Sequence, residues 1–297
     1  FTLLDRISSL RVQLHVDAYQ EEDVMAQWVT IENRGKGKVS LQRFYSSFLN
    51  FRANNYYLTH FYGTWAGEMN CVEECLQPGA KIIESKKGVR TTQSENASFI
   101  LSLDHPAQEN SGRCIGGALA WSGNYKLSFE VDERDYLSLL AGINPFMSAY
   151  ALSEGELFET PKFLFTYSTN GQGTVSRNFH DWARRYGLHA GTKERPILLN
   201  SWEGAYFDFD EQVLTNMMDD AAELGVELFV LDDGWFGNKY PRNSATMGLG
   251  DWQVNEKKLP RGIQYLIDHA TSKGLKFGIW IEPEMVNPKS ELAERHP

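Results

Sequence analysis

Hydrophobic and polar positions alternate along much of the first half of the chain. Over residues 10–16 every second side chain is apolar, which is typical of a strand with one buried face. The same rhythm returns over 125–131. The turn-rich segment 121–125 between apolar runs predicts a hairpin. Many short strands with no convincing helix among them predict a large β-sandwich over residues 1–171.

After residue 171 apolar residues no longer recur at every second position but at the spacing of a helix. Within 172–194, Val175, Phe179 and Trp182 recur at helical spacing, and Gly187 suits the position that ends a helix. This segment therefore predicts a linker helix between two domains.

Residues 195–297 alternate short apolar runs with helical patterns. The runs at 197–200, 226–231 and 275–281 predict buried parallel strands. None of the turns after them carries the glycine fingerprint of a dinucleotide site, so a (β/α)₈ TIM barrel is favoured over a doubly wound sheet. Three strands cannot close a barrel. We therefore expect the start of a truncated barrel, and a chain that is a fragment.

The run at 226–231 ends in two adjacent carboxylates, Asp232 and Asp233, followed by Gly234 and Trp235. Neighbouring side chains of a strand point to opposite faces, so both acids reach one ligand only if the chain turns there. Gly234 permits such a turn. Ligand sites form at the carboxyl ends of parallel strands, and two acids before a Trp favour a site over the alternative, a helix N-cap.

Further carboxylates and indoles follow the other predicted strands or lie in the long loop. They are Glu203, Asp251, Glu282, Glu284, Trp202, Trp252 and Trp280. Indole faces that pack on a sugar ring, with acids that accept hydroxyl protons, suit glycoside hydrolysis, which uses a pair of carboxylates. We assign Trp202 and Trp280 to the pocket, although Trp280 also suits a barrel core. For Asp251, Glu282 and Glu284, a site role and a loop hydrogen-bonding role both stay open.

Composition narrows the class of protein. A formal charge of -10 repels nucleic acid, and no window of the chain is long and apolar enough to span a membrane. Three cysteines favour a reduced compartment, so we expect a cytoplasmic protein. The chain begins at Phe1 rather than Met, so we expect its true N-terminus to be missing. No histidine has a partner at metal-ligand spacing, and we expect neither a metal nor a cofactor.

The chain resembles glycoside hydrolase family 36, the microbial α-galactosidases. The motifs of the second half agree with that family in order and spacing: NSWEGAYFDFDE (200–211), LDDGWFG (231–237), GLGDW (248–252), KLPRGI (258–263) and KFGIWIEPEMVNP (276–288). The first half is similar more loosely, through FYGTWAGE (61–68), WSGNY (121–125), GINPF (142–146), FETPK (158–162) and SRNFHDWARR (176–185). The resemblance implies an N-terminal β-supersandwich and then the first three βα units of a (β/α)₈ barrel.

The resemblance also implies an activity. It implies a retaining glycoside hydrolase that releases terminal α-linked galactose from oligosaccharides such as melibiose and raffinose by double displacement, without a cofactor. Asp232 and Asp233 fall where the family binds galactose hydroxyls, and Trp202 and Trp280 fall on pocket tryptophans. The nucleophile and the acid/base fall beyond Pro297, so no catalytic residue is expected within this chain.

Two stretches depart from the family pattern. The family has Trp-x-Arg-Glu where this chain reads Trp65-Ala66-Gly67-Glu68, and Ser-Ser-His-Gln-His-Asn-Pro where this chain has residues 91–97. In tetrameric members the first loop comes from a neighbouring subunit and helps to close the active site. Trp65 is kept, so it stays a candidate for substrate binding, and either a tetramer or a dimer stays open.

Three alternative functions remain from the sequence. A galactosyl transferase of the raffinose or stachyose synthase type shares the family's barrel. An α-N-acetylgalactosaminidase differs in residues that would lie downstream. A non-catalytic galactoside-binding homologue would carry the same half of the pocket.

Overall fold

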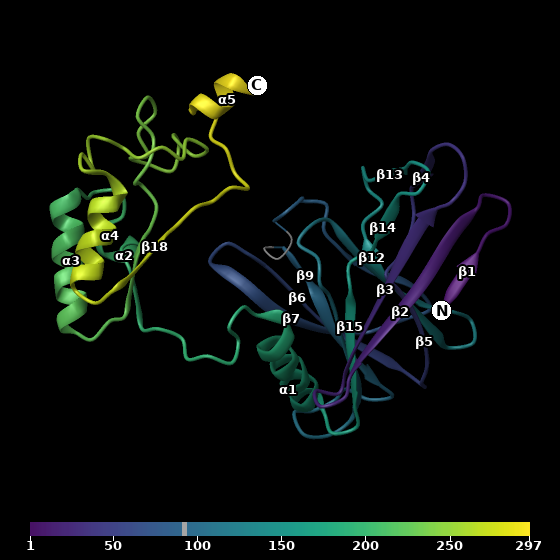
Figure 1. The fold of residues 1–297 in the computed structure, drawn as a ribbon. Coiled ribbons are helices and arrows are strands. Elements are labelled where there is room, and N and C mark those ends of the chain that lie inside the picture. The colour runs from purple at the N-terminus through teal and green to yellow at the C-terminus, as the bar shows by residue number, and fades with distance from the viewer. Residues whose placement is uncertain (91–93) are drawn as a thin grey trace. The chain divides into compact units, whose positions relative to one another are not determined.

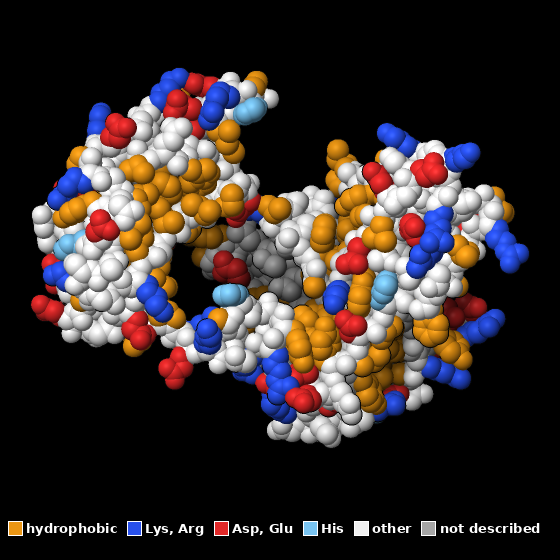
Figure 2. All heavy atoms as spheres, viewed as in Figure 1, with side chains coloured by type: hydrophobic (Ala, Val, Ile, Leu, Met, Phe, Trp, Pro, Cys, Tyr) orange, Lys and Arg blue, Asp and Glu red, His pale blue; other side chains and the backbone are white. Residues whose placement is uncertain are grey.

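The computed structural model describes residues 1–90 and 94–297. It divides into two compact units, Phe1–Thr192 and Lys193–Pro297, which are described separately (Figure 1). On the face shown in Figure 2, charged side chains of both signs are spread over the surface of each unit.

Antiparallel sheets build the first unit. In its described part, a nine-stranded sheet has the order β1 (Thr2–Leu4), β2 (Leu10–Tyr19), β3 (Val24–Asn33), β15 (Phe163–Ser168), β10 (Arg113–Leu119), β9 (Glu95–Leu103), β6 (Tyr56–Thr64) and β7 (Gly67–Cys75), and β14 (Leu157–Glu159) also pairs with β3. A four-stranded sheet has the order β5 (Ser47–Arg52), β12 (Tyr136–Ile143), β11 (Tyr125–Val131) and β8 (Gly79–Glu84), and β13 (Tyr150–Leu152) pairs with β4 (Val39–Leu41).

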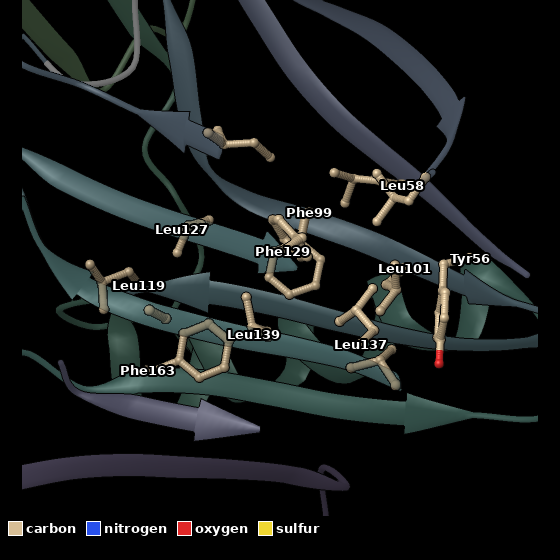
Figure 3. Close-up of a cluster of buried hydrophobic side chains, with 14 of the residues drawn as sticks. Tyr56, Leu58, Phe99, Leu101, Leu119, Leu127, Phe129, Leu137, Leu139 and Phe163 are labelled. Atoms are coloured by element: carbon tan, nitrogen blue, oxygen red, sulfur yellow. The ribbon is translucent and has the colours of Figure 1, made fainter. Parts of the chain in front are cut away.

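The hydrophobic core of this unit lies between the two larger sheets. Phe99 and Phe163 come from β9 and β15 of the large sheet, and Leu127 and Phe129 come from β11 of the smaller one (Figure 3). The rings of Phe99 and Phe129 meet edge to face with their centroids 4.8 Å apart. Burial alternates along β11 as the sequence predicts. The predicted β-sandwich is therefore confirmed.

A helix packs on the outer face of the large sheet. It comprises α1 (Gln172–Trp182) and a final π-helical turn, η1 (Ala183–Gly187). A Cβ at Gly116 of β10 would lie 2.3 Å from Cγ1 of Val175 and 2.8 Å from Cε2 of Phe179. Glycine is required there because any side chain would push α1 off the strand. The predicted helix thus exists, and it lies within the first compact unit.

The hairpin predicted at 121–125 is wrong. The strand before this segment, β10, pairs with β9 and β15, whereas the strand after it, β11, pairs with β8 and β12. The segment therefore carries the chain from one sheet to the other. Alternation along β11 reflects burial against the shared core, which looks the same in sequence whether the strand before it pairs with it or belongs to the other sheet.

A parallel sheet forms the centre of the second unit. Its strands, in spatial order, are β16 (Leu198–Asn200), β17 (Leu228–Leu231) and β18 (Lys276–Ile279). The helices are α2 (Trp202–Ala205), α3 (Glu211–Glu223), α4 (Gly262–Ser272) and α5 (Glu291–Arg295). Asp210 caps α3 by accepting a hydrogen bond of 2.9 Å from Val213 N, as the sequence predicts. In the described part of the chain, no helix combines the length and the hydropathy that a membrane span requires.

The two faces of this sheet differ. The pairing register places Leu199, Phe229 and Phe277 on one face, within a core cluster that includes side chains of α3 and α4. Leu198 and Val230 lie on the other face, where Leu198 is 50% exposed. Figure 2 shows hydrophobic side chains gathered on the surface of this unit, in the region that Figure 1 colours green to yellow. The face that carries Leu198 and Val230 is thus open, and it is mostly apolar apart from Lys276 and Asn200.

Replacing Phe129 tests the assigned sandwich core. Phe129 is fully buried, so Phe129→Ala leaves a cavity between the sheets and should lower the free energy of unfolding by about 3–5 kcal/mol. Phe48→Ala, at a position 55% exposed on β5, is the control and should change it by no more than about 0.5 kcal/mol. Urea denaturation measures both, and equal losses would contradict the assigned core.

Candidate functional site

The chain turns sharply directly after β17. Gly234 has φ of +104°, and a Cβ there would lie 3.1 Å from Cε1 of Phe209, so both the backbone conformation and the available space favour glycine. The turn is held from β16, because Ser201 Oγ accepts a hydrogen bond of 3.0 Å from Asp232 N. The turn predicted at the end of this strand is therefore present.

Asp232 is a partly exposed carboxylate with a fixed orientation. Its Oδ2 accepts a hydrogen bond of 2.6 Å from Asn200 Nδ2, and its Oδ1 accepts one of 2.7 Å from Asp233 N. Asn200 Oδ1 in turn accepts a hydrogen bond of 2.7 Å from Trp202 N. An ionised carboxylate offers about four lone pairs, so roughly two remain for a ligand.

Asp233 has a different environment, because its carboxylate forms a buried ion pair with Arg242. Nε of Arg242 lies 2.9 Å from Oδ1 and 3.1 Å from Oδ2, and Nη2 lies 2.7 Å from Oδ2. Asp233 is 6% exposed and Arg242 is 4% exposed. The sequence treats the two acids as equivalent, whereas the structure leaves Asp233 roughly one unused lone pair, on Oδ1.

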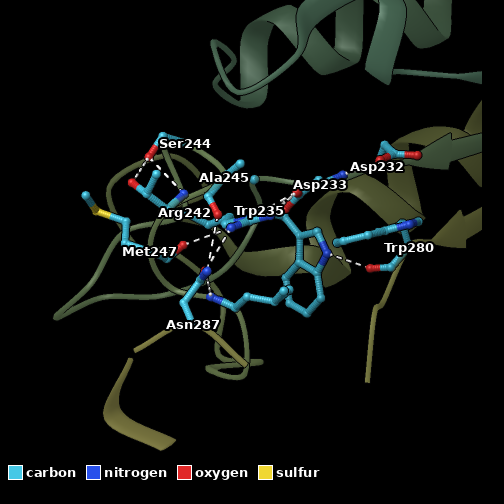
Figure 4. A network of polar contacts seen from close by, with 12 residues as sticks. Asp232, Asp233, Trp235, Arg242, Ser244, Ala245, Met247, Trp280 and Asn287 are labelled. Carbon is cyan, nitrogen blue, oxygen red and sulfur yellow. Dashed lines mark hydrogen bonds and ion pairs between the residues drawn. The ribbon is translucent and has the colours of Figure 1, made fainter. Parts of the chain in front are cut away.

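Arg242 also ties two loops together. Its Nη1 donates to the carbonyl of Met247 at 3.1 Å and to Oδ1 of Asn287 at 3.0 Å. Asn287 reaches back, donating from Nδ2 to Ala245 O at 3.2 Å. In Figure 4 the dashed lines converge on Arg242 from these partners and from Asp233. The loop after β17 is thereby bound to the segment after β18.

A second cation holds the backbone of the same turn. Nζ of Lys258 donates to Phe207 O at 2.7 Å and to Gly234 O at 3.0 Å, and it lies 4.6 Å from the ring centroid of Phe209. Burial lowers the pKa of the Lys258 ammonium, an effect that the charge of Asp233 opposes. The ammonium fixes the carbonyl that follows the acid pair.

Indoles accompany the acids at the carboxyl ends of the strands. Trp202 follows β16 and makes edge contacts with Tyr206 and Phe207, at centroid distances of 5.1 and 5.0 Å. Trp280 follows β18, and its N donates to Leu231 O at 2.9 Å. The structure therefore brings four predicted residues, Trp202, Asp232, Asp233 and Trp280, to one end of the parallel sheet.

The remaining candidates lie elsewhere. Trp65 belongs to the first unit, in the turn between β6 and β7, where it is 81% exposed. Of the second departing stretch, residues 91–93 lie outside the described residues. Asp251 is 3% exposed and accepts hydrogen bonds from Glu291 N and Leu292 N at 2.9 and 3.0 Å, so it caps α5. For Asp251 the loop hydrogen-bonding interpretation holds.

Sequence reasoning missed Asn200 and Arg242. Asn200 is the last residue of β16, so the strand-end argument applied to the acids identifies it equally well. Arg242 lies in an irregular loop without periodicity, and no local pattern indicates its partner. Among the residues that the structure describes, no cluster of three or more His, Cys, Asp or Glu side chains is placed to hold a metal ion.

Comparisons with known proteins agree with this architecture. A model described as the glycosyl hydrolase family 36 N-terminal domain matches residues 1–153, and one described as melibiase matches residues 157–297. The α-galactosidase AgaA of Geobacillus stearothermophilus is 38% identical over 296 residues, which are 99% of this chain and 40% of that protein. Mel36A of Lactobacillus acidophilus is 36% identical over 298 residues, 100% of this chain and 40% of that protein.

Solved structures of α-galactosidases also match this chain. The crystal structure of AgaA matches with a TM-score of 0.91 at 38% identity, covering 100% of this chain and 41% of that one. An AgaA variant in complex with stachyose matches with a TM-score of 0.91 at 37% identity, with the same coverage. Fold and sequence thus define the class as the glycoside hydrolases. Within that class the chain belongs to family 36, the α-galactosidase family, and it spans 40% of the length of the curated relatives named here.

The different environments of the two acids predict different effects on stability. Asp233→Asn removes the charge opposite a buried guanidinium and should lower the free energy of unfolding by about 3–5 kcal/mol. Asp232→Asn, the matched change at the next residue, removes a partly exposed charge and should cost no more than about 1 kcal/mol. Urea denaturation of both variants measures the difference, and equal costs would show that Asp233→Asn does not leave Arg242 as an unpaired buried charge.

Proposed function

We propose that the whole protein is a retaining α-galactosidase that releases terminal α-linked galactose from oligosaccharides of the melibiose and raffinose type. The observation that carries the proposal is the oriented, partly exposed carboxylate of Asp232, at the carboxyl end of β17 and beside Asn200. The proposal draws further support from family membership and from two AgaA variants whose structures contain raffinose and stachyose.

We propose that β16, β17 and β18 are the first strands of a (β/α)₈ barrel. Helices cover one face of this parallel sheet, and Leu198 on the other face is half exposed. An apolar sheet face of this kind is stable when further strands curl round and bury it as a barrel interior. Asn200 and Asp232 continue the alternation of that same face. Their side chains would therefore point into the mouth of the completed barrel.

The chemistry of the site suits a sugar ring. Asp232 offers roughly two free lone pairs and Asp233 roughly one, so both can accept hydrogen bonds from hydroxyl groups at fixed positions. Trp202 and Trp280 supply aromatic faces for the C–H surfaces of a pyranose. The nucleophile and the acid/base belong to later strands beyond Pro297. A retaining reaction requires these two carboxyl groups about 5–5.5 Å apart.

We propose that Trp65 contributes to the same pocket from another copy of the chain in a homo-oligomer. An indole that is 81% exposed on a turn gains by burial against a partner or ligand. Ala66, the next residue of the turn, has a positive φ of 59° and donates a backbone hydrogen bond of 2.9 Å to Oε1 of Glu68, which holds the turn.

Asp232→Asn in the whole protein tests the proposed function. The variant loses charge-assisted hydrogen bonds to substrate hydroxyls, each worth about 1.5–3 kcal/mol, so kcat/KM for an aryl α-galactoside should fall roughly 10- to 150-fold. Asp268→Asn is the matched control, because Asp268 is exposed on α4 and accepts a hydrogen bond from Gln264. It should keep the wild-type kcat/KM.

Steady-state kinetics with and without excess sucrose separate hydrolysis from transfer. Release of free galactose that sucrose does not divert supports the hydrolase. Formation of a trisaccharide would support the galactosyl transferase. Turnover of the aryl α-N-acetylgalactosaminide alone would support the α-N-acetylgalactosaminidase. Galactose binding without turnover of either glycoside would leave the non-catalytic homologue.

A further inference from the structure

We propose that Arg242 is a positioning residue for substrate binding: it fixes the carboxylate of Asp233 so that a single acceptor site, on Oδ1, faces the sugar. This inference rests on the proposed function and assigns a role to a residue that lies in a loop between β17 and α4. Arg242 itself touches no substrate in this account.

The guanidinium is almost fully occupied. It has five N–H groups. Nε points at both oxygens of Asp233, Nη2 bonds Oδ2, and Nη1 bonds both Met247 O and Asn287 Oδ1. One N–H of Nη2 remains. Contacts in three directions hold the planar guanidinium in one orientation. The carboxylate of Asp233, which pairs with it, is therefore held in one orientation as well.

The loop backbone is built to place this side chain. Gly237 and Gly248 have φ of +85° and +82°, and a Cβ on either would lie 2.5 Å from Tyr240 O. The segment 240–242 therefore fits between two glycines that no other residue replaces without strain. Arg242 N also donates to Phe236 O at 3.1 Å. Both the backbone and the side chain of Arg242 are thus fixed before any ligand arrives.

The aromatic surroundings exclude water from the pair. The guanidinium carbon lies 5.5 Å from the ring centroid of Phe207 and 6.0 Å from that of Phe236. Asp233 and Arg242 have side-chain exposures of 8% and 5%. In such surroundings a charged acceptor is strong and does not reorganise when it binds. A ligand lacking the matching hydroxyl would leave a buried acceptor unpaired, so Arg242 contributes to selectivity through Asp233.

Arg242→Lys in the whole protein separates positioning from charge. Lysine keeps the positive charge but loses the planar fork, so Asp233 stays paired yet gains rotational freedom. A displaced Asp233 loses much of one charge-assisted hydrogen bond to the sugar, so the inhibition constant for galactose and the KM for an aryl α-galactoside should each rise roughly 10- to 100-fold. Thermal unfolding of the same sample shows whether the fold is kept.

Arg261→Met is the matched control. Arg261 pairs through Nε with Oε2 of Glu211 at 2.6 Å, and that carboxylate is 7% exposed. The change removes an arginine from a buried acid within the same unit but away from the acid pair. It should lower thermal stability and leave galactose inhibition unchanged.

The double variant Arg242→Met with Asp233→Asn tests a merely structural role. Removing both charges should restore the thermal stability lost in Arg242→Met alone, because no unpaired buried charge remains. Galactose affinity should stay low in the double variant, because the oriented acceptor is gone.

The outcomes are distinguishable. A wild-type protein that neither cleaves α-galactosides nor binds galactose would overturn the proposed function and this inference with it. An active wild type whose Arg242→Lys variant keeps its galactose inhibition constant and KM would overturn the positioning role alone. A double variant that recovers both stability and affinity would reduce Arg242 to a structural residue.

Discussion

The ion pair between Asp233 and Arg242 is the interaction on which the candidate site depends. Two charges at 8% and 5% side-chain exposure are costly to desolvate, and that cost is offset only because the contacts form a bidentate fork with further hydrogen bonds. Hydrophobic side chains would hold the loop at least as well. We therefore interpret the pair as an interaction that orients one carboxylate rather than as a net source of stability.

The turn that carries the acids is held from several segments far apart in sequence. Asn200 and Ser201 bond Asp232 from the end of β16, Arg242 bonds Asp233 from the following loop, and Lys258 bonds the carbonyl of Gly234. Parallel pairing of β16 with β17 brings Asn200 and Ser201 to the acids, whereas Arg242 and Lys258 belong to the loop that follows β17 and folds back on the turn. The α/β unit thus already orients both acids of the candidate site.

Periodicity predicted the parts of the fold that depend on burial alone. Alternation along β11 indicated the sandwich, because it follows from which face of a strand is covered, and the glycine after the two acids indicated the turn at the end of β17. The segment 121–125 could not be predicted correctly, since strands that pair and strands that face each other across a core share one pattern. Arg242 could not be found either, because its partner is defined by a loop fitted between Gly237 and Gly248.

A crystal structure of the whole protein soaked with galactose is the most direct test of this account. We expect a ring hydroxyl within hydrogen-bonding distance of Asp232, a second hydroxyl on Oδ1 of Asp233, and an Arg242 fork with the geometry found without ligand. Galactose bound at another place, with both carboxylates contacting protein atoms alone, would contradict the account.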